Sequence, residues 1–259
     1  MSAILAVDAF SAPDLERRFG GLRRLYGDVG YERIRAARVA VVGLGGVGSW
    51  AVEALARSGV ASLSLIDLDH VVESNINRQV QATTTSLGQA KAQALRERIA
   101  EIHPACAVHE IEEFVDESNW PGLLTGPVDA VIDACDQVRA KAAIAAWAVA
   151  EGAMLVSVGA AGGKHRAQAV ELDDLANTTH DPLLASLRQR LRKHHGAARS
   201  GPIGVACVYS KEPVSLPAAG SCDVDGSLNC AGYGSSVTVT ATFGLVAAGE
   251  VLKRLAERA

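Results

Sequence analysis

Paired cysteine motifs are missing from this chain of 259 residues. No two of its cysteines have the CxxC spacing of a structural zinc site. Their odd number and irregular spacing, with no signal peptide ahead of them, are typical of a reducing compartment and speak against a disulfide framework. The cysteines are Cys106, Cys135, Cys207, Cys222 and Cys230. We therefore expect a cytoplasmic protein without structural zinc.

Aromatic residues and net charge are also low. Aromatic residues make up 4% of the sequence, whereas 25 residues are glycine, a balance that suits many tight strand-to-helix turns. The hydrophobic content of 49% excludes a disordered chain and is sufficient for one large α/β domain. The formal net charge of −4 means that any surface for nucleic acid is a local patch rather than a global field.

No long apolar run has the composition of an ordinary membrane span. The one candidate is the uncharged run 231–249, which glycine, serine and threonine make too polar. We interpret this run as a helix buried in the protein or at a subunit interface, with membrane association as the alternative.

Strands alternate with helices from residue 38 onward. Residues 38–42 (RVAVV) are an apolar run, glycines follow, and an alanine-rich segment to Ser58 is typical of a helix. The alternation continues with strands at 61–66, 106–111, 128–133 and 154–158, and with helices at 87–102 and 138–150. This pattern predicts an α/β fold with a Rossmann-like, doubly wound and mainly parallel sheet.

The predicted organisation is a single domain in three parts. Residues 1–35 form an N-terminal helical arm, 36–163 an ATP-binding Rossmann-like core, and 164–259 a C-terminal α+β extension. One helix of the extension is delimited by Asp181 as N-cap, Pro182 at the first position and Gly196 past the end. Residues 211–235, rich in Gly, Ser, Pro and Asp, predict a long mobile loop, and such loops are often functional.

A glycine-rich turn follows the first strand of the core. Glycines at such a turn let the backbone approach phosphates, and the next helix supplies N–H donors at its N-terminus. The glycines are Gly43, Gly45, Gly46 and Gly48. Asp67 ends the next strand and can accept both ribose hydroxyls. Glycines can also do no more than shape a turn, and this pair does not separate ATP from a dinucleotide.

The loop after Asp67 is rich in polar side chains. It carries Asn75 and Arg78, and Lys91 follows on the next predicted helix. A dehydrogenase needs an apolar slot for nicotinamide, whereas amides, a guanidinium and an ammonium match a triphosphate better. Asp136 follows a later strand, where it would hold Mg²⁺ against phosphates or act as a helix N-cap.

These segments carry a resemblance to a known superfamily. GLGGVG, LIDLDHVVESNINRQ, GQAK around Lys91 and DACD resemble the adenylating enzymes that include the ubiquitin-activating enzymes. The resemblance implies that Asp67 holds ribose, that Asn75, Arg78 and Lys91 act on the phosphates, and that Asp136 holds the metal ion.

The same resemblance implies a homodimer. Arg24 would reach the ATP of the partner subunit as an arginine finger, although Arg18 and Arg23 lie in the same arm and are alternatives.

Five further segments are similar to the tRNA threonylcarbamoyladenosine dehydratases, over nearly the whole chain from about Arg17. They are RFGGLRRLYG (18–27), VIDACDQVRAKAA (131–143), SVGAAGG (157–163), DPLLASLRQRLR (181–192) and TVTATFG (238–244). The resemblance implies ATP-dependent adenylation of the carboxylate of a threonylcarbamoyl group on the adenosine beside the anticodon of tRNA. That group then cyclises with loss of AMP, which is a net dehydration.

Two basic clusters fit a tRNA substrate. They are Lys164, His165 and Arg166, and the set Arg188, Arg190, Arg192, Lys193, His194, His195 and Arg199. Such side chains can orient RNA through phosphate contacts, although a charged helix face is often only solvated. The sequence leaves open whether a monovalent cation binds and whether a cysteine desulfurase of a sulfur-relay system is a partner.

Cys230 is the cysteine best placed to be exposed, in a glycine-flanked loop. Its thiolate can take the acyl group from AMP as a thioester before ring closure, or it can lie near the site without being required. An incidental thiol is a third interpretation.

Three other functions compete with a dehydratase. An adenylyltransferase for the C-terminus of a ubiquitin-like or sulfur-carrier protein commonly has paired CxxC motifs, which this sequence lacks. The polar loop after Asp67 disfavours an NAD-dependent oxidoreductase. The full set of expected ATP contacts disfavours an inactive dimerisation module.

Overall fold

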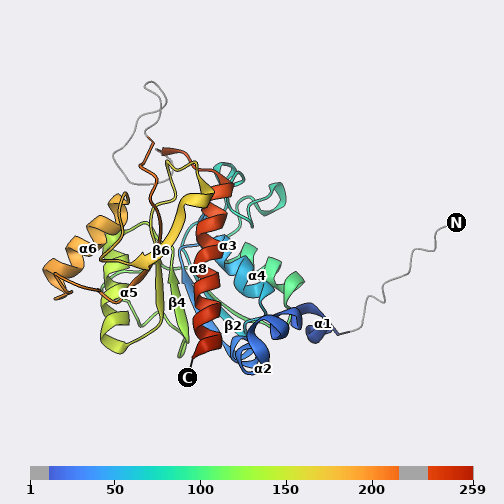
Figure 1. Cartoon of the computed structure of the whole chain (residues 1–259). Helices are drawn as coiled ribbons and strands as arrows, with labels where there is room; N and C mark the ends of the chain where they lie inside the picture. Colours follow the sequence, from blue (N-terminus) through green and yellow to red (C-terminus); the bar gives the residue numbers. More distant parts are fainter. Residues whose placement is uncertain (1–11, 216–232, 259) are drawn as a thin grey trace.

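A seven-stranded sheet with the order β3-β2-β1-β4-β5-β7-β6 forms the centre of the computed structural model, which describes residues 12–215 and 233–258 (Figure 1). The strands are β1 (Arg38–Val42), β2 (Ser62–Ile66), β3 (Ala107–Ile111), β4 (Ala130–Asp133), β5 (Leu155–Val158), β6 (Val170–Asp174) and β7 (Ala206–Ser210). Neighbouring strands are parallel except β6 and β7. The predicted doubly wound, mainly parallel α/β fold is confirmed.

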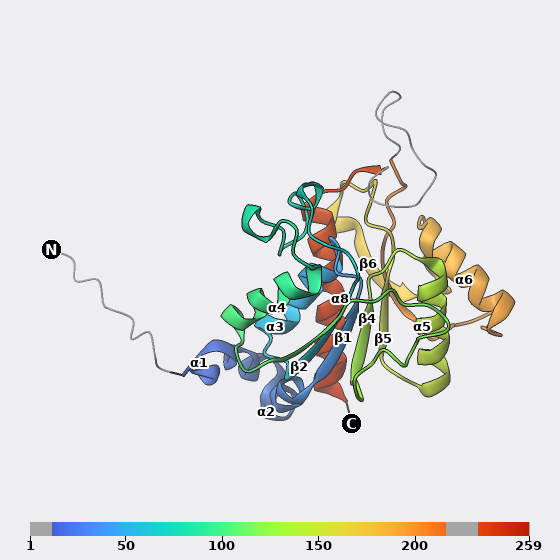
Figure 2. The ribbon, with the colours of Figure 1, turned by 180° about the vertical axis from the view of Figure 1, so that it is seen from behind.

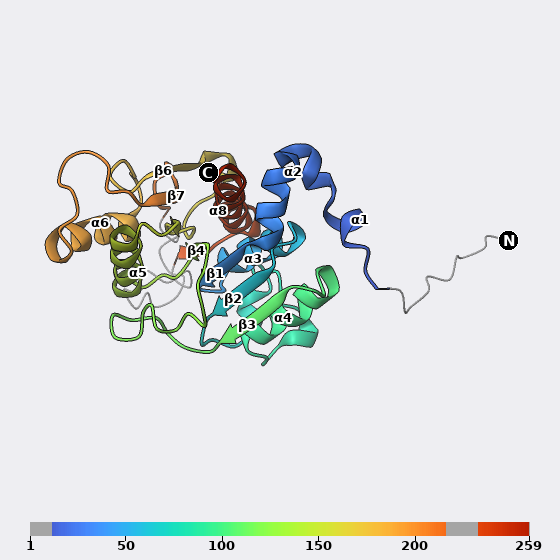
Figure 3. The same ribbon diagram turned by 90° about the horizontal axis from the view of Figure 1, so that it is seen from below.

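Helices cover both faces of this sheet (Figure 3). The helices are α1 (Leu15–Phe19), α2 (Gly21–Ala36), α3 (Gly48–Arg57), α4 (Lys91–Ile102), α5 (Val138–Glu151), α6 (Pro182–His194) and α8 (Val237–Glu257), with short 3-10 turns η1 (Glu73–Asn75), η2 (Thr84–Ser86) and η3 (Ala167–Ala169). One buried cluster joins α2, α3, α4 and α8 to the sheet, and a second joins α5 and α6 to its other face.

Strand β1 shows why the central strands are apolar throughout. Val39 and Val41 belong to the first buried cluster, whereas Ala40 and Val42 belong to the second. Because both faces of the strand are covered, both alternating sets of side chains must be apolar.

The arm packs against α4 and α8 of its own chain (Figure 2). Arg18 Nη1 donates to the Ile102 carbonyl at 2.7 Å, and the Phe19 ring lies edge-on to His103 at the end of α4. Arg33 on α2 donates to the Ala256 carbonyl on α8. The three-part division of the chain stays a prediction, but strands β6 and β7 of the extension belong to the same sheet as the core.

The predicted helix at 87–102 begins four residues late, at Lys91. The residues before it form a turn in which Gly88 has a φ of +84°, and Val71 N–H donates to Gln89 O while Lys91 N–H donates to Asp69 O. These bonds and the bridge between His70 and Ala90 hold the residues before α4 against the loop after β2. Lys91 is therefore the first residue of the helix, where its side chain faces that loop.

Helix α8 contains most of the uncharged run 231–249 and continues past it to Glu257. It lies so close to α3 that a Cβ at Gly244 would be 2.4 Å from the Val47 carbonyl oxygen. Phe243 and Ala247 are fully buried, which confirms a largely buried helix. Within the parts of the chain that the structure describes, no helix is long and apolar enough to cross a membrane.

Candidate active site

A cavity of about 630 Å³ opens at the carboxyl ends of the parallel strands. The chain order of the strands reverses between β1 and β4, which is where open α/β sheets bind ligands. The loops after β1, β2, β4 and β5 all line this cavity. Its volume is in the range of ordinary small-molecule sites.

The glycine turn after β1 forms one side of the cavity. Gly43 has a φ of +84°, and a Cβ there would lie 2.8 Å from the backbone of Ala134 after β4. A Cβ at Gly48 would lie 1.8 Å from the Gly43 carbonyl oxygen, so both positions require glycine. Gly45 faces open space, and no side chain caps the N-terminus of α3. The turn therefore leaves room for a bound group beside free N–H donors, an arrangement that suits phosphate.

Asp67 lies at the end of β2, where the sequence places it. Its Oδ2 accepts a hydrogen bond from Leu44 N–H in the glycine turn at 2.6 Å, and its Oδ1 accepts one from Asp69 N–H at 2.8 Å. Burial raises the pKa of Asp67, and the nearby Lys91 ammonium partly opposes this shift. The carboxylate is thus fixed beside the glycine turn, as a ribose-binding group must be.

Lys91 is buried and paired with two carboxylates. Its Nζ lies 2.7 Å from Asp69 Oδ2 and 3.9 Å from Asp67 Oδ1. Asp69 lies in the polar loop after Asp67 and lines the cavity, but it was not among the predicted site residues. Its role follows from the hydrogen bond between Lys91 N–H and Asp69 O, which brings the two side chains together.

The polar loop brings Arg78 and Asn75 to the same cavity. Arg78 Nη1 donates to the Ser74 carbonyl at 2.6 Å, and the stem of Arg78 would contact a Cβ at Gly46 at 3.1 Å. Asn75 is buried and accepts a hydrogen bond from Val72 N–H. Both side chains therefore lie beside the glycine turn, as predicted for phosphate-binding groups.

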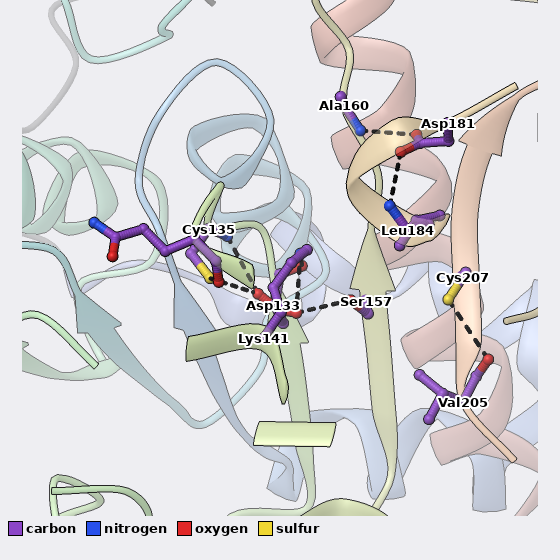
Figure 4. Close-up of polar contacts among 10 residues, drawn as sticks. Asp133, Cys135, Lys141, Ser157, Ala160, Asp181, Leu184, Val205 and Cys207 are labelled. Carbon is purple, nitrogen blue, oxygen red and sulfur yellow. Dashed lines mark hydrogen bonds and ion pairs between the residues drawn. The ribbon is translucent and has the colours of Figure 1, made fainter. Parts of the chain in front are cut away.

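The two aspartates of the DACD segment have different environments, and Figure 4 shows the contacts of Asp133. Asp136 is exposed and lines the cavity. Asp133 is fully buried, and its Oδ2 accepts hydrogen bonds from Lys141 Nζ at 2.9 Å and Ser157 Oγ at 2.7 Å. No local sequence pattern indicates this pair, because Lys141 looks like any other basic residue of a predicted helix. Of the two aspartates in this segment, only Asp136 has a carboxylate exposed to a ligand in the cavity.

Cys135 lies between these aspartates and lines the cavity. Burial and the Asp133 carboxylate raise the pKa of Cys135 well above its ordinary value. Its Sγ donates to Asp133 Oδ1 at 3.0 Å. These contacts disfavour the thiolate form of Cys135, which is the reactive form of a cysteine. Cys230 lies outside the described residues.

A second half of the cavity has small and apolar walls. The turn after β5 supplies Gly159, Ala160, Ala161 and Gly162, and the first turn of α6 supplies Pro182 and Leu183. The described ends of the predicted loop 211–235 lie on this turn: Ser215 N–H donates to Gly163 O and Gly163 N–H donates to Gly234 O. This half can hold a second substrate beside the nucleotide groups.

The arginines of the arm are distinguished by their contacts. Arg23 pairs with Glu16, Asp28 and Glu32, and Arg18 binds the end of α4. Arg24 is exposed and does not line the cavity of its own chain. A role in its own subunit's site is therefore excluded for Arg24, and its role in a partner's site stays a prediction.

The predicted basic clusters are partly wrong as RNA surfaces. Lys164 is buried, and its Nζ donates to the carbonyls of His180 and Glu212. Arg188 Nη1 likewise donates to the carbonyls of Leu175 and Thr178. These cations hold backbone carbonyls inside the fold, so they cannot bind phosphate. The remaining exposed members of the second cluster are Lys193, His194, His195 and Arg199.

Comparison with known proteins agrees with this geometry. The tRNA threonylcarbamoyladenosine dehydratase of Escherichia coli (strain K12) is 41% identical over 254 residues, which cover 94% of this chain and 95% of that protein. Solved structures of E. coli tRNA N6-threonylcarbamoyladenosine dehydratase in complex with ATP and with AMP are each 40% identical to this chain, with a TM-score of 0.85. Each covers 95% of this chain, and this chain covers 97% and 98% of them. The model described as the ThiF family matches residues 18–259, and the chain belongs to that family.

Proposed function

We propose that this protein is an ATP-dependent enzyme that dehydrates threonylcarbamoyladenosine in tRNA. The observation that carries the proposal is one cavity with two unlike halves. One half gathers the glycine turn, Asp67, Arg78 and Lys91, which suit ATP, and the other has small apolar walls. The similarity to a dehydratase over 94% of the chain, and to its ATP and AMP complexes, supports this substrate.

The reaction has two steps. A carboxylate oxygen of the threonylcarbamoyl group attacks the α-phosphorus of ATP, which releases pyrophosphate and leaves an acyl-adenylate. An atom of the ureido group then attacks the acyl carbon, and AMP leaves with the activated oxygen. Lys91 and Arg78 stabilise charge on the phosphates during the first step. Because the nucleophile of the second step is tethered, positioning provides most of its acceleration.

Magnesium is the metal ion that suits Asp136. The described part of the chain contains no group of three or more His, Cys, Asp or Glu side chains that could hold a metal ion. Mg²⁺ commonly binds one or two carboxylates together with substrate phosphates, so one exposed aspartate at the cavity is sufficient. When bound, the ion would neutralise charge on the phosphates. Asp136→Asn should therefore raise the magnesium concentration required for activity.

A homodimer is the form that would use Arg24. Leu25 is 71% exposed and Val29 is 64% exposed, on either side of the break that Gly27 (φ +71°) makes in α2, and Leu25 directly follows this arginine in the chain. Leu245 on the outer side of α8 is 49% exposed. Exposed apolar side chains of this kind are typical of subunit contacts. We infer that this surface meets a second copy and that Arg24 completes the partner's site.

The test of function is a requirement for the modified tRNA. With ATP and Mg²⁺, AMP should be released with tRNA that carries threonylcarbamoyladenosine, and nucleoside mass analysis should show the loss of one water from that nucleoside. Unmodified tRNA and no tRNA are the controls. Equal AMP release with all three would refute the dehydratase proposal and leave an adenylating enzyme. A cytoplasmic location and a cysteine desulfurase partner stay predictions.

A further inference from the structure

Asp181 links two separate segments of the cavity wall (Figure 4). Its Oδ1 accepts a hydrogen bond from Leu184 N–H at 3.0 Å, which is the predicted N-cap of α6. Its Oδ2 accepts a second hydrogen bond from Ala160 N–H at 2.9 Å, in the turn after β5. The side chain is only 4% exposed. An N-cap needs the first bond alone, so the second bond has a separate role.

Several costly features hold this carboxylate in place. A Cβ at Gly159 would lie 2.0 Å from Asp181 Oδ2, so the close approach requires glycine there. His180 has a φ of +58°, a conformation that is unfavourable for a residue other than glycine. The buried Lys164 ammonium donates to the His180 carbonyl at 2.9 Å and fixes this strained residue. Burial raises the pKa of Asp181, and the two backbone N–H donors offset part of that cost.

Both segments that Asp181 joins line the half of the cavity opposite the nucleotide groups. Residues 159–162 come from the turn, and Pro182 and Leu183 come from the first turn of α6. In the described residues, none of the groups assigned to ATP forms a hydrogen bond or ion pair with Asp181. The carboxylate therefore fixes the acyl side of the cavity and leaves the nucleotide side to other residues.

We propose that Asp181 is a positioning residue for the acyl substrate. It holds the turn at 159–162 and the start of α6 as one rigid wall, which keeps the acyl-adenylate beside its own ureido group and away from water. This proposal rests on the dehydratase function proposed above. Without the link, water attacks the acyl carbon, AMP leaves, and the original carboxylate is restored. ATP is then consumed without a cyclised product.

The test uses a variant that keeps the N-cap and removes the second bond. Asp181→Ser retains a hydroxyl that can cap α6, since serine is a good N-cap, but one oxygen cannot serve both Leu184 and Ala160. We expect unchanged ATP affinity and a cyclisation rate lower by roughly ten- to a hundredfold, the scale of a small misplacement at a reacting centre. The ratio of AMP released to cyclised nucleoside should rise above that of the wild-type protein.

Asp181→Asn is the matched second variant, because it keeps the side-chain volume but replaces one acceptor oxygen by a donor. It should show the same uncoupling if serine disturbs folding. A structural role alone predicts a lower melting temperature with an unchanged ratio of AMP to product below that temperature, and this result would overturn the proposal. If the wild-type protein itself gives no cyclised product, the proposed function fails and not the role of Asp181.

Discussion

Replacing Lys141 by methionine should destabilise the protein strongly, because it leaves the Asp133 carboxylate buried without its counter-charge. Both side chains have an exposed fraction of 0%. Lys141 Nζ donates to Asp133 Oδ2 at 2.9 Å and to the Asp133 carbonyl at 3.3 Å. Burial is the largest single influence and lowers the pKa of Lys141, but the attraction and hydrogen bond of Asp133, together with the nearby cysteines, outweigh burial and raise the pKa. The ammonium is therefore charged, and its loss exposes the full cost of burying the carboxylate.

The magnitude follows from that burial. Removing one partner of a buried ion pair costs about 3–5 kcal/mol, out of a total stability of about 5–15 kcal/mol for a typical protein. For a chain of this size, about 2–4 °C is lost per kcal/mol, so the melting temperature should fall by roughly 6–20 °C. ATP affinity should also fall. Asp133 accepts hydrogen bonds from the backbone N–H and the thiol of Cys135, and these bonds hold the segment that carries Asp136 at the cavity.

The assay is urea denaturation with thermal melting, both without nucleotide. The matched control is the double variant Asp133→Asn with Lys141→Met, which replaces the ion pair by neutral groups of similar volume. Replacing both members of a buried pair is often close to neutral, so most of the lost stability should return. If Lys141→Met stayed within about 1 kcal/mol of the wild-type protein, or the double variant were no better, the argument from the buried charge would be wrong.

The remaining predictions concern the site and the arm. Lys91→Ala should lower AMP formation by about a hundred- to a thousandfold in folded protein, and a near-normal rate would contradict the ATP site. Mixing inactive Arg24→Ala and Lys91→Ala subunits should restore part of the activity through hybrid dimers, whereas no rescue after verified subunit exchange would remove Arg24 from the partner's site. Asp136→Asn should raise the magnesium requirement, and an unchanged magnesium titration would count against this ligand. Burial and the nearby Arg35 and Arg18 lower the pKa of His103, which packs against Phe19. Neutral His103 contributes its full stabilisation of the fold above the ordinary histidine pKa of 6.5. This contribution is lost as the pH falls below 6.5 and then below the lowered pKa of His103 in the folded protein. The wild-type melting temperature should therefore fall more than that of His103→Gln between about pH 7 and about pH 5, and parallel profiles would refute this.

Local patterns in the sequence were sufficient for the fold and for half of the site. The apolar run 38–42 followed by glycines predicted a strand, a turn and a helix, because hydrophobic spacing and turn chemistry act between residues that are close in the chain. The position of Asp67 after the next strand placed it at the same edge of a parallel sheet. These patterns, together with the resemblance to the adenylating enzymes, predicted that the glycine turn, Asp67, Asn75, Arg78 and Lys91 lie together, and the structure has all of them in one cavity.

Only the tertiary structure decided the partners of the charged residues. A lysine has the same letter in the sequence whether it is solvated, as a helix face usually is, or buried against carbonyls, as Lys164 is. Lys141 and Asp133 meet eight positions apart because a turn of the chain folds them together, and Asp181 reaches Ala160 across 21 positions. The energy of these contacts depends on burial and on distances between segments, and neither quantity is contained in a local pattern. Local sequence patterns thus predicted which residues line the cavity, whereas the folded packing fixes which charges support the cavity wall and which remain exposed.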